Sequence, residues 1–152
     1  MKSTILSTAA RALMPILILL SILVLWRGHN APGGGFIGGL LAVIAVALYT
    51  IAHGADSALK LLRVEPLSLA GIGLACAVVS GLWGIAAEGY FLKGVWPFYE
   101  YVSGKGTQGV PVGSILLFDT GVYLTVLGAV SAILFALEDA VYPQPDDEEE
   151  AD

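Results

Sequence analysis

The sequence predicts an all-α integral membrane protein with four transmembrane helices. Of the 152 residues, 57% are hydrophobic and 13% are charged, whereas about a quarter of the residues are charged in ordinary soluble domains. Four apolar windows follow one another along the chain, each with the roughly 20 residues that cross about 30 Å of hydrocarbon. A soluble fold could not cover that much apolar surface, so composition and span count exclude one.

The predicted spans are residues 5–26, 32–53, 67–87 and 113–137, within a transmembrane domain over residues 1–140. The first span has Arg11 near one end, where its guanidinium can reach the lipid headgroups. No small-residue cleavage site follows this span, so we expect it to stay as an anchor and not to be removed as a signal peptide. Residues 141–152 hold most of the net negative charge and have the composition of a disordered acidic tail.

The second span starts within a glycine-rich stretch, Gly28 to Gly39, which reads G-H-N-A-P-G-G-G-F-I-G-G. Asn30 can cap the helix, and Pro32 suits a first turn, where backbone N–H groups lack partners. Each glycine costs a helix about 0.8–1.0 kcal/mol in water, but in lipid the backbone must make its hydrogen bonds internally, which holds the helix together. We therefore predict a helix that begins near Pro32 and allows another helix or an ion to approach its backbone closely.

The third span follows a short polar link in which Asp56 and Lys60 have the i,i+4 spacing that supports a helical turn. Along the span itself, Gly73, Ala77 and Gly81 recur every four residues. This is the small-xxx-small pattern that brings helix backbones together in lipid. We expect this face of the helix to pack closely on a neighbour.

A long loop, residues 88–112, joins the third and fourth spans. It is rich in aromatic residues: Tyr90, Phe91, Trp96, Phe98, Tyr99 and Tyr101. Because aromatic side chains gather at the membrane–water interface, we expect the loop to lie on the membrane surface or to cap a partner. The fourth span is expected to end where Glu138, Asp139 and Pro143 follow its apolar run.

Lysine and arginine positions give the expected orientation. With four spans both termini share one side of the membrane. That side carries Lys2, Arg11, Lys60 and Arg63, and the other carries Arg27, Lys93 and Lys105. The positive-inside rule then places both termini in the cytoplasm, by a margin of one residue.

Asp119 is the only acidic residue inside a predicted span. A central aspartate costs a transmembrane helix about 2.5–3.5 kcal/mol, so such residues usually face a cavity or a partner. Asp119 lies roughly 9 Å from the start of its helix, and two interpretations stay open. It relays a proton or a cation, or it stabilises the N-terminal dipole of the helix near the interface. Thr120 and Tyr123 are close enough to hydrogen-bond with it in either case.

Two histidines, His29 and His53, flank the second span. Free histidine titrates near pH ~6.5, so each could pass protons at a membrane surface, although water or headgroups can equally satisfy an interfacial histidine. No His-x-x-x-His or Cys-x-x-Cys spacing occurs, so no metal site is predicted. Cys76, the single cysteine, is expected to be a small buried apolar residue.

Several functions have no support in the sequence. The glycine stretch lacks the lysine and Ser/Thr of a phosphate-binding loop, and no predicted strand precedes it. We find no Ser-His-Asp set, no paired catalytic carboxylates and no basic patch. The sequence therefore predicts neither an enzyme nor a nucleic-acid-binding protein, and it implies no cofactor.

Two motifs resemble a known family. G-H-N-A-P-G-G-G-F-I-G-G-L-L leads into the second span, and F-D-T-G-V-Y-L-T-V-L-G-A lies in the fourth. From about Arg11 to Leu137, the chain is similar to the MnhB/MrpB family. These proteins are the B-type subunits of the multisubunit Na+/H+ antiporter of bacteria and archaea, and their relatives also occur in membrane-bound hydrogenases. The glycine motif is the more specific of the two, and the acidic tail lies outside the family pattern.

The resemblance implies a small multi-pass subunit of the cell (inner) membrane that does not transport alone. Its partners would be larger antiporter-like subunits and the lipid bilayer, with Na+ and H+ as the transported ions. By position, Asp119 matches the intramembrane acid of the family, and Pro32 and Phe36 match its helix-start motif. We take Asp119, His53 and Thr120 as ion-path candidates. We take the following residues as the helix-start motif and subunit contact: His29, Pro32, Gly33, Gly34, Gly35, Phe36, Gly38 and Gly39.

Three functions stay open at this point. In the first, the chain is a non-catalytic antiporter subunit in which Asp119 accepts a proton or Na+. In the second, it is a scaffold whose glycine helix lets partners pack. In the third, it is the corresponding subunit of a membrane-bound hydrogenase or a related respiratory complex. A self-sufficient transporter is disfavoured, because one carboxylate in four helices provides no polar pathway.

Overall fold

The structure is a computed structural model, and it describes residues 4–28, 32–102, 106–109 and 112–141. Four long apolar helices able to cross a membrane confirm the predicted all-α fold class. These helices are α1 (Thr4–Arg27), α2 (Gly35–His53), α4 (Pro66–Glu88) and α5 (Ser114–Val141). By length and composition, the chain is a multi-pass membrane protein.

Two helix ends differ from the predicted ones. α2 begins at Gly35 and not at Pro32, because Gly34 has φ 106° and ψ −177°, a backbone conformation that no helix contains. Gly34, and not Asn30, is therefore the N-cap, and Asn30 itself lies outside the described residues. α5 continues through Glu138 to Val141, because the Glu138 side chain turns inward and does not end the helix. The predicted acidic tail lies, beyond Val141, outside the described residues.

Two further elements were not predicted. The polar link after α2 forms an eight-residue helix, α3 (Ala55–Leu62), where the sequence indicated a single turn. Arg63, directly after it, caps the helix with a left-handed backbone conformation (φ 58°). The aromatic loop contains an antiparallel hairpin, β1 (Tyr99–Val102) with β2 (Gly106–Gly109). The Tyr-Glu-Tyr-Val sequence of β1 has the aromatic and β-branched residues that favour strands.

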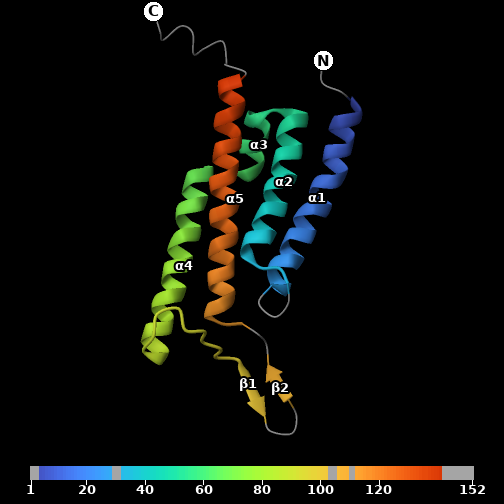
Figure 1. Cartoon of the computed structure of the whole chain (residues 1–152). Helices are drawn as coiled ribbons and strands as arrows, with labels where there is room; N and C mark the ends of the chain where they lie inside the picture. Colours follow the sequence, from blue (N-terminus) through green and yellow to red (C-terminus); the bar gives the residue numbers. More distant parts are fainter. Residues whose placement is uncertain (1–3, 29–31, 103–105, 110–111, 142–152) are drawn as a thin grey trace, which may run out of the picture.

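The long helices stand side by side in a row, in the order α1, α2, α5, α4 (Figure 1). α1 packs on α2, α2 packs on α5, and α5 packs on α4, so the row does not close into a bundle. The start of α1 and the end of α5 point to the same side of the molecule, at the top of Figure 1. A chain with an even number of spans has both ends of its helical region on one side of the membrane. Which side that is stays a prediction.

Small residues bring α4 and α5 into close contact. A Cβ on Gly121 would lie 2.7 Å from the Ala77 nitrogen, and one on Gly73 would lie 2.6 Å from the Gly121 carbonyl oxygen. Real Cβ atoms do not come that close to other atoms, so the backbones touch here as the small-xxx-small pattern predicts. Gly81, the third member of the pattern, faces the Phe91 ring of the loop instead.

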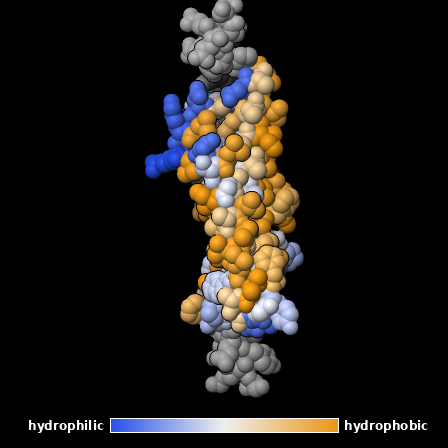
Figure 2. Space-filling model, turned by 90° about the vertical axis from the view of Figure 1, so that its left-hand side faces the viewer, coloured by the Kyte–Doolittle hydropathy of each residue, from blue (hydrophilic) through white to orange (hydrophobic). Residues whose placement is uncertain are grey.

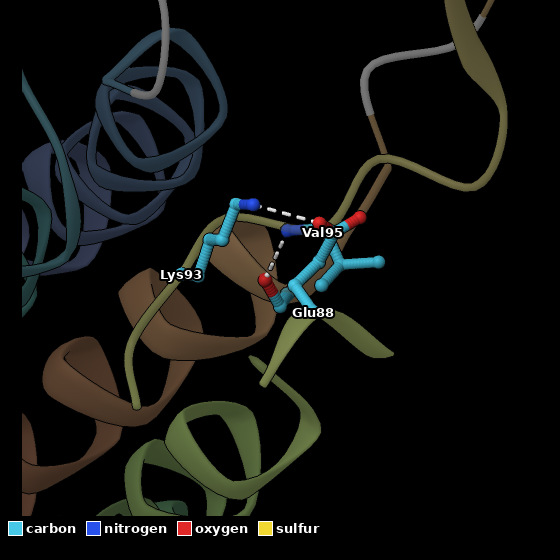
Figure 3. A network of polar contacts seen from close by, with 4 residues as sticks. Glu88, Lys93 and Val95 are labelled. Carbon is cyan, nitrogen blue, oxygen red and sulfur yellow. Dashed lines mark hydrogen bonds and ion pairs between the residues drawn. The ribbon is translucent and has the colours of Figure 1, made fainter. Parts of the chain in front are cut away.

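The loop between α4 and α5 is tied to both helices. The Val95 N–H donates to Ser114 Oγ at 2.9 Å, and the Ser114 N–H donates to the Val95 carbonyl at 3.0 Å. The Ser80 hydroxyl of α4 donates to the Ser114 carbonyl at 2.5 Å. Figure 3 shows Lys93 reaching Glu88 at 2.7 Å beside Val95. That ion pair is about half exposed and adds little stability, so the buried serine bonds hold the loop.

The row leaves broad apolar faces uncovered. α2, in the middle, is the most buried long helix, and α1 is the least buried. Figure 2, seen from the α4 end, shows hydrophilic residues near both ends and an apolar surface between them. Buried apolar side chains cluster between α2, α3 and α5: Val46, Ala55, Ala58 and Phe135. The remaining apolar surface is far larger than a monomer exposes to water, so lipid or other membrane subunits must cover it.

Candidate functional site

The turn between α1 and α2 folds the glycine motif back onto the end of α1. The Gly34 N–H donates to the Val24 carbonyl at 3.2 Å, and the Gly28 N–H donates to the same carbonyl at 3.0 Å. Only glycine adopts the backbone angles of Gly34 without strain. Of the predicted motif residues, Pro32 is exposed and His29 lies outside the described residues.

One face of α2 is formed by glycines, so its backbone packs directly on α1 and α5. Gly35, Gly38 and Gly39 are buried and have no room for a side chain. A Cβ would meet the Asp119 carbonyl oxygen at Gly35, the Ser21 carbonyl oxygen (2.9 Å) at Gly38, and the Tyr123 carbonyl oxygen (3.0 Å) at Gly39. The close approach predicted for this helix is therefore made with α1 and α5 of the same chain.

The Asp119 carboxylate lies at the N-terminal end of α2. A Cβ on Gly34 would lie 3.7 Å from Asp119 Oδ1 and 3.9 Å from Oδ2. The first hydrogen bond within α2 joins the Gly38 N–H to the Gly34 carbonyl at 3.0 Å, so the N–H groups before it have no acceptor in their own helix. The partial positive charge of such a terminus stabilises a nearby carboxylate by about 0.3–2 kcal/mol. The dipole interpretation of Asp119 thus has a geometric basis, but the dipole belongs to α2 and not to the helix that carries Asp119.

Tyr123, one turn beyond Asp119, bonds to α1. The Ser21 hydroxyl donates its only proton to the Ile18 carbonyl at 2.8 Å, so the Tyr123 hydroxyl is the donor in the 3.0 Å contact between Tyr123 Oη and Ser21 Oγ. Both side chains are buried. The Tyr123 ring passes over Gly38, where a Cβ would lie 3.2 Å from the ring. Tyr123 therefore ties α5 to α1.

Thr120 lies on a different face of α5 from Asp119. Its hydroxyl donates to the Leu116 carbonyl, one turn back, at 2.8 Å. Its side chain lines an apolar cavity of about 320 Å³ between α4, α5 and the loop, with Trp83, Pro97, Phe98, Val112, Gly113, Leu116 and Leu117. The structure does not bring Thr120 and Asp119 into one site.

His53 ends α2, about 27 Å from Gly35 at 1.5 Å per residue. Its Nδ1 lies 3.3 Å from the Tyr49 carbonyl and donates to it, because a carbonyl only accepts. Its Nε2 lies 3.0 Å from the Ser7 hydroxyl of α1, which donates when the imidazole is neutral. The ring also stacks on Tyr49, with ring centroids 4.3 Å apart. His53 and Asp119 therefore belong to opposite ends of the molecule.

Apolar side chains separate these two ends. Val46 of α2 and Phe135 of α5 belong to one apolar cluster, and Leu127 and Leu134 pack against it. Among the described residues, no group of three or more His, Cys, Asp or Glu could hold a metal ion. The chain thus presents a carboxylate at one end of α2 and an imidazole at the other.

The sequence did not predict the hydrogen-bond partners of His53 and Tyr123, which are Ser7 and Ser21. Ser21 is a single polar residue in a long apolar run of α1, and that isolation was a usable signal; Ser7 lies next to Thr8 and was not distinguished in this way. Glu138 resembles a helix terminator in the sequence, because it is followed by another acid and then a proline. Its inward direction depends on the register of α5 against α3, which no local pattern shows.

The chain is similar to antiporter subunits over most of its length. Residues 5–132 match the family of domains related to the MnhB subunit of the Na+/H+ antiporter. The B-type Na(+)/H(+) antiporter subunit of Bacillus subtilis (strain 168) is 34% identical over 131 residues, which cover 86% of this chain and 89% of that protein.

Two longer chains contain a similar region. A probable K(+)/H(+) antiporter protein of Rhizobium meliloti (strain 1021), whose name joins the A-type and B-type subunits, is 34% identical over 131 residues, 84% of this chain but 12% of that protein. The structure of the Mrp complex from Dietzia sp. DQ12-45-1b has a chain with 37% identity and a TM-score of 0.73, matched over 93% of this chain and 15% of that one.

Proposed function

The chain belongs to the MnhB family of antiporter subunits, and from this premise we propose that it is a non-catalytic membrane subunit of a multisubunit monovalent cation/proton antiporter. The extent of the likeness carries the proposal. The family match over residues 5–132 includes both the glycine start of α2 and Asp119 of α5, and these are the residues that meet at the candidate site.

Larger subunits of the antiporter are the proposed partners. In the Rhizobium meliloti and Dietzia proteins the similar region is a small part of a longer chain, so it is covalently joined to a much larger protein there. The open row of helices supports the same arrangement here, because it leaves long apolar faces on both sides. The relatives are named for Na+ and for K+, so the proposal extends to monovalent cations and no further.

Pro32 and Phe36 are the motif residues that we propose for the subunit contact. Gly35, Gly38 and Gly39 are committed to α1 and α5 of the same chain. Phe36, in contrast, is 58% exposed, and Pro32 precedes it on an exposed turn. An exposed phenylalanine and a proline next to a rigid glycine turn provide an apolar anchor for another membrane subunit.

Asp119 is the residue that we propose for the ion path. Its carboxylate lies where three chain segments meet, beside the positive end of α2 and next to a glycine that adds no side chain. An ionised carboxylate in this position can accept a proton or a monovalent cation. The rest of the path would come from a neighbouring subunit, because the polar groups of the described residues do not connect Asp119 with His53.

The test is cation/proton exchange in everted membrane vesicles that carry the whole complex. Asp119→Asn removes the charge and keeps the size of the side chain, so we expect exchange to be lost while the complex still assembles. Thr120→Val is the companion variant; its hydroxyl is already bonded to Leu116, so exchange should stay at the wild-type level. Unchanged exchange in the Asp119→Asn complex would remove Asp119 from the ion path.

A scaffold function is the second candidate, and the exposed apolar side chains along the row of helices favour it. If the chain only holds partners in place, Asp119→Asn leaves exchange intact. Gly35→Leu, which collides with the Asp119 backbone, would instead disperse the complex on native gels. The result for Asp119→Asn therefore separates an ion-path role from a purely structural one, whereas Gly35→Leu disturbs the packing of this chain under both.

A further inference from the structure

We propose that the apolar cavity between α4, α5 and the loop that joins them is a binding site for one acyl chain of a membrane phospholipid. The cavity has a volume of about 320 Å³. The inference goes beyond the proposed function, because it rests on this cavity and on the membrane-spanning helices around it. It holds whether or not the complex is an antiporter, and whether or not Asp119 lies in an ion path.

The walls of the cavity offer almost no polar group to water. Most of the lining side chains are aliphatic or aromatic, including Leu116, Leu117 and Phe98. The Thr120 hydroxyl already donates its proton to the Leu116 carbonyl at 2.8 Å. Apolar cavities of about 150 Å³ stay dry and take up apolar ligands, so a cavity of this size and lining should bind an apolar molecule in place of water.

Buried hydrogen bonds and close backbone contacts hold the cavity in shape. Two bonds between Val95 and Ser114, at 2.9 and 3.0 Å, fix the loop to the start of α5. Ser114 is in turn bonded to Ser80 of α4. Gly113, which lines the cavity, has no room for a side chain, because a Cβ there would collide with the Val95 carbonyl. The cavity is therefore part of the fixed structure and does not depend on the conformation of one side chain.

The cavity lies near one surface of the membrane. Leu116 and Thr120 stand about 3 and 9 Å along α5 from its first residue, at 1.5 Å per residue. Trp83, on the facing side, stands about 8 Å from the end of α4. Tryptophan is typical of this depth, because its ring is apolar and its indole N–H can bond to headgroups. The cavity is thus at the level where acyl chains leave the headgroup region.

The mouth of the cavity is continuous with the surface that the bilayer covers. Two of the lining side chains, Trp83 and Phe98, are 40% and 67% exposed. Seen from the α4 end, the apolar surface of the helices runs down to the hydrophilic residues at the lower end of the molecule (Figure 2). An acyl chain can therefore enter the cavity from the bilayer without crossing water.

Van der Waals packing drives this binding. A lipid chain is as apolar in the bilayer as in the cavity, so its transfer gains nothing from the exclusion of water. The walls of an empty cavity, however, lack the contacts that a filled cavity supplies. A partner helix, about 10 Å wide with its side chains, does not fit into a cavity of this volume, whereas a flexible acyl chain does.

Photo-crosslinking in the assembled complex tests the proposal. Phe98 is replaced by the photoreactive residue p-benzoylphenylalanine, and the membranes are irradiated before the complex is purified. The intact mass of the chain should then increase by that of one phospholipid. Leu116→Trp, which fills the cavity, should remove most of this adduct. Ile133→Trp is the matched control, because Ile133 is 59% exposed on the same helix and does not line the cavity; it should leave the yield of the adduct unchanged.

Three results would contradict the proposal. An adduct of equal yield with and without Leu116→Trp would show chance contact with the surrounding lipid. An adduct that contains a peptide of another subunit would assign the cavity to a side chain of that subunit, and a chain without any adduct would leave the cavity without a lipid. Thr120→Phe fills the same cavity from a second position and should give the same loss, so it replaces Leu116→Trp if that variant does not assemble.

Discussion

The Tyr123 hydroxyl of α5 donates to the Ser21 hydroxyl of α1 at 3.0 Å, and both groups are buried. The bond joins the third helix of the row to the first. It does so across Gly38 of α2, because a glycine there leaves the space that the tyrosine ring occupies. α1 and α5 otherwise touch only narrowly, and α1 is held mainly by its packing on α2, so this bond adds a direct link from α1 to the helix that carries Asp119.

Removing either hydroxyl should lower the stability of the chain. Ser21→Ala leaves the Tyr123 hydroxyl buried without its acceptor, and Tyr123→Phe removes the donor to Ser21, whose own proton stays bonded to the Ile18 carbonyl. We expect each to lower the free energy of unfolding by about 1 kcal/mol, since interhelical hydrogen bonds in membranes average about 0.6 and reach about 1.7 kcal/mol. Thermal unfolding of the purified complex measures the loss. The double variant should lose less than the sum of the two, and fully additive losses would contradict the bond.

Packing between α4 and α5 can be tested with two glycines that lie two residues apart. Gly73 touches the α5 backbone, whereas nothing lies within 4 Å of a Cβ on Gly71. Gly73→Ala should destabilise the chain by about 1–3 kcal/mol, as overpacking does. Gly71→Ala should be neutral, or stabilising by up to about 1 kcal/mol, because alanine is the better helix former. Equal unfolding temperatures for the two variants would show that α4 does not pack on α5 through this face.

The subunit contact at Phe36 can be tested against another exposed apolar residue of the same helix. Phe36 is 58% exposed and Ile44 is 53% exposed, so truncating either costs the isolated chain little. If Phe36 anchors a partner subunit, Phe36→Ala should weaken assembly by about 2 kcal/mol or more, as loss of an aromatic anchor does. Ile44→Ala should not. The amount of partner that co-purifies in mild detergent measures the difference, and equal recovery would assign Phe36 to lipid.

The spans could be predicted from the sequence because membrane helices are set by length and apolarity. A run of about 20 apolar residues identifies each helix whatever it packs against. The same reasoning failed at Gly34, because a run of glycines fits a helix and a turn equally well. The positive φ of Gly34 belongs to the turn that folds back onto the end of α1. The residues next to Gly34 do not predict that turn.

The candidate site could be predicted only in part. Asp119 was visible as a carboxylate in an apolar run, and the glycine stretch as a place of close approach. That the two meet depends on the register of α5 against α2, which joins residues 85 positions apart, Gly34 and Asp119. For the same reason Thr120, next to Asp119 in sequence, could not be assigned to a different face until the neighbours of α5 were known.

The order of the helices in the row has a consequence for biosynthesis. α1 and α2 are made before α4 and pack on each other, but α4 packs on α5, which follows it in the chain. Before α5 is inserted, α4 lies in the bilayer without the helix on which it packs, so its glycine face contacts lipid or a helix of another protein. In a nascent chain that stalls before α5, α4 would thus not yet be packed against the pair of α1 and α2, and α5 is the helix that joins them.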